Sequence, residues 1–290
     1  MIDLELLEEL VAFNEYGTLS ATAEHLMITQ PSVTRGMKQL EQELGVKLFN
    51  RQVNKITLNE TGKLAAKEAK KIVEAENNFT EKVINFSKTK ANIHIGSTAP
   101  GPLIWLKQNR KIFNKSLSFT NQLIKETNTI SALTNYKERL IVTTQEINTK
   151  LIESMYLGIE HLYVKLSPND PLASYNSVTL KTLTGNSFLV ANEIGPWRKV
   201  LSQNIPNATF LYQTNVAALD EITHNSSFPT FRSNLTLNSH IPNRDNDNKI
   251  IIPVIGKNSS LIFYGSYLKK QRKNIQPLLK EIISIWTKAK

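Results

Sequence analysis

Residues 18–62 hold the feature that most constrains this chain, which is a pair of short helical patterns separated by only a few residues. The first runs from about Ser20 to Met27 and the second from about Gln30 to Glu43. Two helices joined by so short a connection form a helix-turn-helix arrangement. The fold of the N-terminal part is therefore expected to be mainly helical.

The second of these helices has clear ends. Thr29 can accept a hydrogen bond from a first-turn amide, Pro31 tolerates a position that needs no donor, and Gly45 ends the helix. Its apolar residues recur every three or four positions and predict one buried stripe. The members of this stripe are Val33, Met37, Leu40 and Leu44.

The opposite face of the same helix carries hydroxyl, amide and cationic side chains and no carboxylate. Such a face suits a recognition helix, because these groups can meet base edges and phosphates near the helix N-terminus. The expected DNA contacts are Gln30, Pro31, Ser32, Thr34, Arg35 and Lys38. The alternative is an ordinary solvated helix face, to which these spacings alone give about equal weight.

The residues after this helix favour the DNA-binding interpretation. Val46–Phe49 alternates as a strand, residues 51–55 form a polar turn, and Ile56–Leu58 returns as a second strand. A hairpin directly after a recognition helix is a wing. Arg51 and Lys55 are then expected to lie along the phosphate backbone.

The run AEHLMITQPSVTRGMKQLEQELGVKLFNR, followed by TLNETG, resembles the N-terminal winged helix-turn-helix of the LysR-type transcriptional regulators. The resemblance implies a DNA-binding domain over residues 1–58, a dimerising linker helix over 59–88 and an effector-binding domain over 91–290. The sequence departs from the family pattern at Thr22, Gly36 and Asn59. Gly36 inside a helix is expected to cost roughly 1 kcal/mol relative to alanine.

A long helix is predicted from an N-cap at Asn59 to about Ser87, since no proline or glycine follows Gly62 in this stretch. Its apolar residues step by four and three alternately, as in a coiled coil. We therefore expect a homodimer or homotetramer, with Ala69, Ile72, Phe79 and Val83 at the dimer interface. The alternative is a long helix that packs only on its own domain.

After Thr89 short strands alternate with helices, which predicts an α/β fold with parallel strands. The expected strands are Asn92–Gly96, Leu117–Leu123, Arg139–Thr143, His161–Leu166 and Leu261–Tyr264, and the final helix is expected over Ile275–Thr287.

The LysR resemblance extends to this region, through the order of its elements and the turn SPNDPLA at residues 167–173. It implies a two-lobed fold like that of periplasmic binding proteins, with lobe I at about 91–163 and 260–290 and lobe II at about 164–259. Ligands bind such folds where loop amides and hydroxyls converge at strand ends. We expect effector contacts from Ser97, Thr98, Thr129 and Asn192, although each could instead be a cap or turn residue.

The formal net charge of +10 is unevenly distributed. Residues 1–90 carry 12 basic and 13 acidic side chains, whereas the remaining 200 residues carry 23 and 12. Within the N-terminal part, however, residues 1–28 hold six acids and no base, and residues 29–63 hold six bases and three acids. Local polarity therefore supports DNA binding, and the basic surplus elsewhere suggests, as a hypothesis, an anionic effector or added DNA contact.

Catalysis finds no support in the sequence. The five histidines lie far apart, and no HExxH, GxSxG, P-loop or GxGxxG motif occurs. There is no cysteine, and neither an apolar run of about eighteen residues nor a secretory leader is evident. We expect no enzyme activity, metal, cofactor or membrane contact, and a cytoplasmic protein.

These observations predict a sequence-specific DNA-binding regulator that responds to a small molecule. Ligand binding would shift the relative placement of the DNA-binding domains and so alter contact with promoter DNA or RNA polymerase. One alternative is a structural or regulatory DNA-binding protein with no functional effector site. Another is a transport-type binding protein with an incidental helix-turn-helix.

Overall fold

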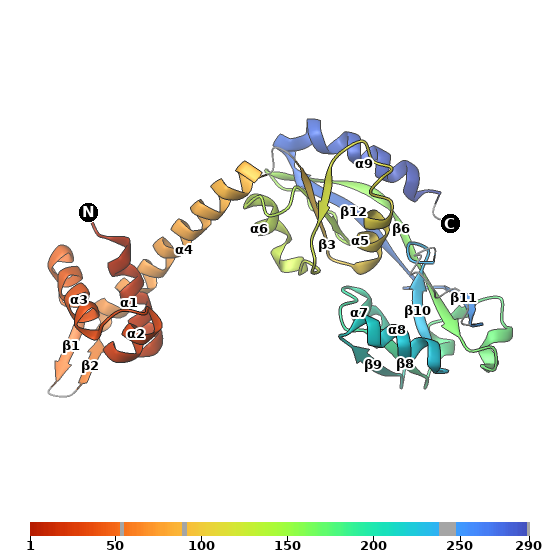
Figure 1. The fold of residues 1–290 in the computed structure, drawn as a ribbon, viewed down its shortest axis with the longest axis horizontal. Helices are drawn as coiled ribbons and strands as arrows, with labels where there is room; N and C mark the ends of the chain where they lie inside the picture. The colour runs from red at the N-terminus through yellow and green to blue at the C-terminus, as the bar shows by residue number, and fades with distance from the viewer. Residues whose placement is uncertain (53–54, 89–91, 238–247, 289–290) are drawn as a thin grey trace. The chain divides into compact units, whose positions relative to one another are not determined.

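The computed structural model describes residues 1–52, 55–88, 92–237 and 248–288. The chain forms two compact units, Met1–Ile84 and Asn85–Lys290 (Figure 1). No helix in the described ranges is long and apolar enough to cross a membrane.

The first unit is a three-helix core followed by a hairpin and a long helix. Its elements are α1 (Leu4–Tyr16), α2 (Leu19–His25), α3 (Gln30–Leu44), β1 (Phe49–Gln52), β2 (Lys55–Leu58) and α4 (Glu60–Lys88), which continues into the second unit. Leu10, Phe13, Val33 and Leu40 are fully or almost fully buried at its centre. The helix-turn-helix and its wing are therefore present in the predicted order.

The predicted helix ends are confirmed at three places. The Thr29 hydroxyl accepts from the Ser32 amide at 3.3 Å, and Gly45 ends α3 in the left-handed conformation with φ of 68°. The Asn59 side chain accepts from the Gly62 amide at 2.8 Å. The bounds differ slightly elsewhere, since α2 begins at Leu19 rather than Ser20 and ends at His25 rather than Met27.

Two local predictions in this unit are wrong. Leu44 is 39% exposed and does not join the buried stripe of α3, because it lies in the last turn, beyond the helices that cover Val33 and Leu40. The first wing strand is Phe49–Gln52 rather than Val46–Phe49, and Phe49 pairs with Leu58. The first strand is therefore displaced by three residues and the second begins one residue earlier than expected, so Arg51 and Lys55 lie in strands instead of a turn.

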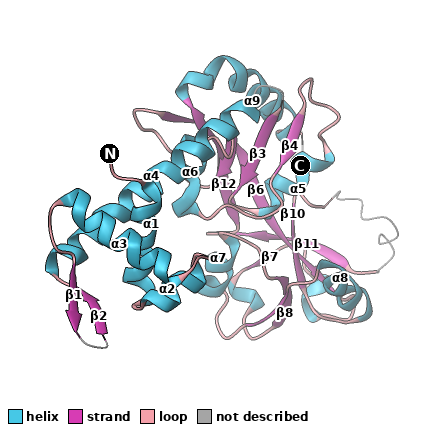
Figure 2. Cartoon of the chain, turned by 60° about the vertical axis from the view of Figure 1, so that its left-hand side comes forward, coloured by secondary structure: helices cyan, strands magenta, loops and turns pink. Residues whose placement is uncertain are grey.

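The second unit contains lobe I, whose elements come from two separate parts of the chain. The N-terminal part supplies β3 (Ile93–Ser97), α5 (Pro100–Gln108), β4 (Leu117–Phe119), α6 (Thr129–Thr134) and β5 (Leu140–Thr143), with a 3-10 turn at Glu126–Asn128. The C-terminal part supplies β12 (Ser260–Leu268), a 3-10 turn at Lys269–Gln271 and α9 (Arg272–Trp286). Helix α9 packs on β6 (Ile152–Leu166) and β12, and α5 packs on β3 (Figure 2).

Lobe II is the middle of the chain and has its own apolar core around Leu183, Phe188 and Trp197. Its elements are β7 (Val178–Thr179), β8 (Ser187–Ala191), α7 (Trp197–Asn204), β9 (Thr209–Gln213), α8 (Val216–Asn225), β10 (Thr230–Ser233) and β11 (Ile250–Ile255). Short 3-10 turns occur at Pro171–Ser174 and Lys181–Leu183.

The long strand β6 belongs to both lobes. Residues 152–161 pair with β12 of lobe I, and residues 162–166 pair with β10 and β11 of lobe II. Among the described strands, the main sheet runs in the order β4-β3-β5-β12-β6-β11-β7, and β8 and β9 form a separate pair. The expectation of parallel strands is correct for β3 with β4 and β5, for β8 with β9 and for β7 with β11. It is wrong for β12, which runs antiparallel to β5 and β6, and for the pairing of β10 and β11 with β6. A parallel neighbour of β6 would need a crossover connection, whereas β10, β11 and β12 run along β6 in the opposite direction.

Candidate nucleic-acid interface and effector cleft

The expected recognition face of α3 is open to solvent. Gln30, Pro31, Arg35 and Lys38 are exposed, and neither cation forms an ion pair within the described residues. Ser32 and Thr34 are half-buried, and their hydroxyls are engaged locally. Ser32 Oγ contacts Thr29 Oγ1 at 2.9 Å, and Thr34 donates to the Gln30 carbonyl at 3.0 Å. Arg35 and Lys38 are therefore the cations of this face best placed to reach DNA.

Gly36 lies on the buried side of α3 against Glu9 of α1. A Cβ atom at Gly36 would overlap the Glu9 carboxylate, so the glycine provides the space that this side chain occupies. Burial, together with the nearby Glu5 charge, raises the pKa of Glu9 to about 7. The departure from the family pattern at Gly36 thus coincides with a carboxyl group packed against the recognition helix.

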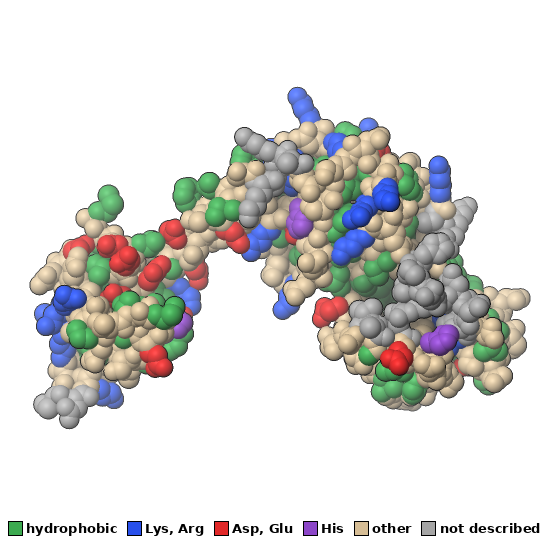
Figure 3. All heavy atoms as spheres, viewed as in Figure 1, with side chains coloured by type: hydrophobic (Ala, Val, Ile, Leu, Met, Phe, Trp, Pro, Cys, Tyr) green, Lys and Arg blue, Asp and Glu red, His purple; other side chains and the backbone are tan. Residues whose placement is uncertain are grey.

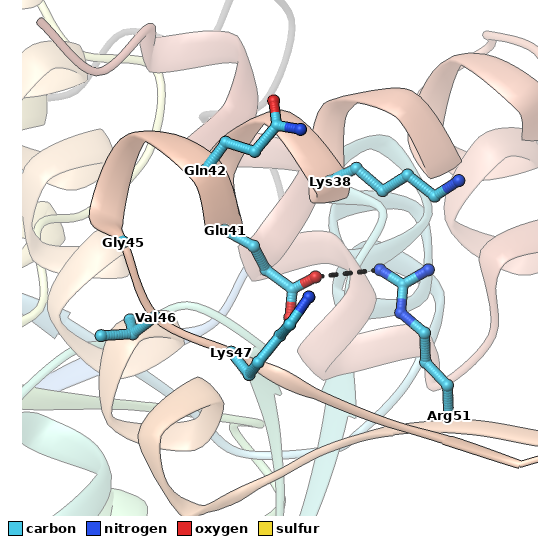
Figure 4. A pocket seen from close by; sticks show the side chains of 7 residues that line it. All are labelled: Lys38, Glu41, Gln42, Gly45, Val46, Lys47 and Arg51. Atoms are coloured by element: carbon cyan, nitrogen blue, oxygen red, sulfur yellow. Dashed lines mark hydrogen bonds and ion pairs between the residues drawn. The ribbon is translucent and has the colours of Figure 1, made fainter.

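The wing is fixed to α3 by Glu41. Its Oε1 accepts from the amides of Leu48 and Phe49 at 2.7 and 3.2 Å, and its Oε2 accepts from Arg51 at 3.0 Å (Figure 4). Burial acts to raise the pKa of Glu41, but the two amides and Arg51 together outweigh it and lower this pKa. Arg51 therefore forms an internal ion pair with Glu41, while part of its side chain remains exposed at the surface.

Lys38, Lys47 and Arg51 surround a surface pocket of about 520 Å³ next to this ion pair. Lys47 is an exposed cation at this surface that was not among the DNA contacts expected from the sequence. Its position one residue before the buried Leu48 is the sequence feature that indicated its exposure. Lys55 is exposed at the start of β2. In the first unit, basic side chains lie over α3, and acidic side chains gather mostly on the side where the N-terminus and the start of α1 lie (Figure 3).

The apolar stripe of α4 is largely exposed. Ile72, Phe79 and Val83 are 52%, 67% and 54% exposed, respectively. Ala69 differs, because it is buried in the core of the first unit and offers no surface to a partner helix. An exposed stripe of large apolar side chains indicates an interaction surface.

Three of the four nominated effector residues are buried in lobe I. The Ser97 hydroxyl donates to the Ala99 carbonyl at 2.7 Å, and Thr98 is directed at the Val142 carbonyl at 3.4 Å. Thr129 is 1% exposed at the start of α6. The fourth, Asn192 of lobe II, is half-buried and accepts from Arg198 at 3.1 Å. Ser97 thus has the local role that the alternative interpretation assigns to it, whereas the buried Thr129 hydroxyl has no hydrogen-bond partner among the described residues.

A cleft of about 950 Å³ lies between the lobes. Thr98 is the nominated residue among those that line it. Lobe I contributes Lys125, Glu126 and several polar residues, and lobe II contributes Glu193, Lys199 and several more. Sequence reasoning missed these four charged residues, because they lie on loops and a helix face with no motif of their own.

The described residues contain no group of three or more His, Asp or Glu side chains that could hold a metal ion.

Residues 4–63 match the family model described as "Bacterial regulatory helix-turn-helix protein, lysR family". The N-terminal helix-turn-helix of this chain is therefore of the LysR-family type. Relatives of this chain include the uncharacterized regulator YbhD of Escherichia coli, which is 33% identical over 89 residues that cover 31% of this chain and 27% of YbhD. YybE of Bacillus subtilis is 25% identical over 201 residues, covering 65% and 66% of the two chains. The regulator MetR of Buchnera aphidicola is 28% identical over 181 residues, covering 60% and 56%.

These alignments span about a quarter to two thirds of the relatives' own length. All three relatives are named as transcriptional regulators and not as enzymes.

Solved structures extend the similarity of fold to nearly the whole chain. Full-length OxyR from Pseudomonas aeruginosa superposes with a TM-score of 0.54 at 17% identity, covering 98% of this chain and 95% of OxyR. Full-length CbnR in complex with its target DNA gives a TM-score of 0.52 at 16% identity, covering 97% and 99%. The predicted fold class, a winged helix-turn-helix with a linker helix and a two-lobed α/β domain, is confirmed.

Proposed function

We propose that this LysR-type chain is a sequence-specific DNA-binding transcriptional regulator that responds to a small molecule. The observation that carries the proposal is the exposed, carboxylate-free face of α3 next to the wing, with Arg35 and Lys38 outside any ion pair of the described residues. The match of residues 4–63 to the LysR-family helix-turn-helix and the CbnR–DNA complex among the similar structures give further support. Such a regulator would act in the cytoplasm, where it meets promoter DNA and RNA polymerase.

We further propose that the protein assembles as a homodimer or homotetramer through α4. The exposed stripe of Ile72, Phe79 and Val83 supports this assembly. Two linked recognition helices would then read half-sites about one helical turn or more apart.

The effector would occupy the cleft between the lobes. Each wall presents one lysine and one glutamate, with amide and hydroxyl side chains around them. This mixed lining supports a polar ligand with balanced charge better than a strongly anionic one, because each added anionic group would face a carboxylate as well as an ammonium group.

The test is binding of the purified protein to DNA upstream of its own gene, with random DNA as competitor, across a salt series. Retained preference together with a steep salt dependence is the expected result. Loss of preference would favour a structural DNA-binding protein without an effector, a candidate supported by the burial of Ser97 and Thr129. Absence of any binding would contradict both.

A further inference from the structure

Glu160 is a buried carboxyl group at the junction of the two lobes. It lies in β6 opposite Leu261, two residues before β6 begins to pair with β10. Its side chain is almost completely buried, with 2% of the residue exposed. Nothing in the proposed DNA contacts or the cleft lining uses this residue, so its burial needs another explanation.

Segments of both lobes converge on this carboxyl group. The Trp197 Nε1 of α7 donates to Oε2 at 2.9 Å, and the Ser233 hydroxyl of β10 donates to Oε1 at 2.6 Å. On the lobe I side, Gly101 of α5 packs so closely that a Cβ there would overlap Oε1. Glu160 therefore connects α7 and β10 of lobe II to α5 of lobe I.

A second contact between the lobes lies two residues before Trp197. Gly195 has φ of 56°, and a Cβ on it would overlap the Thr98 carbonyl of lobe I. The backbones of the two lobes therefore touch beside the effector cleft, which both Thr98 and Gly195 line. Separation of the lobes would remove this contact and would uncover Trp197 and Glu160 together.

The environment of Glu160 favours its neutral form. Burial raises its pKa, and the hydrogen bonds from Ser233 and Trp197 oppose this only in part. No ion pair to Glu160 occurs within the described residues. The other charged or titratable side chains on these segments and on β12, which pairs with β6 at Glu160, are Lys107 on α5, Glu153, Tyr156, His161, Tyr163 and Lys165 on β6, Arg198 and Lys199 on α7, Arg232 on β10, and Tyr264 and Tyr267 on β12.

We propose that Glu160 is a latch between the lobes, which in its neutral form holds α7 and β10 against α5 and on ionisation releases them. The proposal rests on the proposed function only in that the lobes enclose the effector cleft. An effector that touches both walls would bind the latched form and so would be coupled to Glu160.

The direction of the pH dependence follows from linkage. The carboxyl group binds its proton more tightly when the lobes are closed than when water reaches it in the open form. Closure is therefore fully favoured below the ordinary carboxyl pKa near 4.5. Above that pH the ratio of closed to open molecules falls by up to about tenfold per pH unit, until the raised pKa of the closed form is reached.

The distance between the lobes can be measured directly, because the full chain contains no cysteine. Gln122→Cys and Gln203→Cys place one spin label on each wall of the cleft. Pulsed electron resonance from pH 5 to 9 should show a short distance giving way to a longer one as the pH rises. In Glu160→Gln the short distance should persist at every pH, because the amide still accepts from Trp197 and can donate to Ser233.

Glu153→Gln is the matched control, since Glu153 lies on the same strand but pairs with Arg272. It should keep the pH response of the parent protein. A distance that is independent of pH in the parent, or a Glu160→Gln variant that follows the parent, would overturn the latch.

If Glu160→Gln does not fold, Ser233→Ala keeps the titrating carboxyl group and must still show the pH response, so a flat profile would overturn the proposal. No DNA is present in these measurements. Failure of the latch is therefore distinguishable from failure of the regulator function, which the binding of upstream DNA tests separately.

Discussion

The carboxylate of Glu41 lies 3.0 Å from the guanidinium of Arg51, and this ion pair joins the recognition helix to the first strand of the wing. The Glu41 side chain is 5% exposed, whereas the Arg51 side chain is 40% exposed. The same carboxylate also holds the amides of Leu48 and Phe49. The orientation of the wing is thus set by a residue of α3 and not by the hairpin itself.

Arg51→Gln should therefore lower stability as well as DNA affinity. It leaves Glu41 with its two amide partners but without its cation, and we expect the free energy of unfolding to fall by about 1–2 kcal/mol. Urea unfolding of the full chain measures this change. Lys55→Gln is the control, because Lys55 is exposed on β2 and its loss should leave stability unchanged. Equal stability of the two variants would contradict the internal role of Arg51.

Arg35→Ala should weaken binding to specific DNA by about 1–3 kcal/mol and relax base preference, if Arg35 reads a base edge. Lys55→Ala should instead lower affinity evenly across sequences and flatten the salt dependence. Fluorescence anisotropy with upstream and random DNA separates the two behaviours. An equal loss on both DNAs for Arg35→Ala would assign Arg35 to the phosphate backbone.

Phe79→Asp should weaken self-association, because it places a charge in the exposed apolar stripe of α4. Sedimentation should then show a smaller mass at micromolar concentration. Asn77→Asp adds the same charge on the opposite side of the helix, since two residues correspond to about 200° of rotation. A Phe79→Asp variant with the parent mass would refute the assignment of α4 as the dimer helix.

Two glycines near the DNA-binding surface should respond oppositely to alanine. At Gly36 the obstacle is the end of the flexible Glu9 side chain, so Glu9 can move into solvent and the helix gains up to about 1 kcal/mol. At Gly62 the obstacle is the Leu48 carbonyl of the backbone, and we expect a loss of about 1–3 kcal/mol. Thermal and urea unfolding of Gly36→Ala and Gly62→Ala measure these two changes in stability. Equal destabilisation of both variants would contradict the predicted difference.

Glu9 gives the first unit a stability that depends on pH. Because burial, with the Glu5 charge, raises the pKa of Glu9 to about 7, folding favours the protonated form. Its contribution is fully present below pH 4.5 and is lost as the pH rises through 7, and we expect about 1–2 kcal/mol after allowance for solvent screening. Glu9→Gln should abolish this part of the pH dependence in urea unfolding. A carboxyl titration in NMR that stays near pH 4.5 would contradict the packing described.

The sequence was most informative where the determinants are local. The Thr29 cap, the stop at Gly45 and the apolar spacing of Val33, Met37 and Leu40 defined α3, because each acts within a few residues. The wing register was missed because alternation in a short hairpin permits several registers, and the contact that selects one is the Glu41 carboxylate on the Leu48 and Phe49 amides.

The effector residues were harder to predict. Ser97 ends β3 and Thr98 follows it, but the Ser97 hydroxyl donates to the neighbouring Ala99 carbonyl and the Thr98 hydroxyl is directed at the Val142 carbonyl. The start of β6 was also missed. Residues 152–160 gain strand structure by pairing with β12, which lies about a hundred residues further along the chain.

The continuous strand β6 determines how lobes I and II unfold. If a loop connected the lobes, one lobe could unfold while the other stayed folded. Here the single strand β6 forms backbone hydrogen bonds with β12 of lobe I and with β10 and β11 of lobe II. Fraying of residues 162–166 removes pairing partners from lobe II and leaves the end of the β12 ladder unsupported. The two lobes should therefore exchange their amide hydrogens as one cooperative unit, in which loss of either lobe carries the other with it.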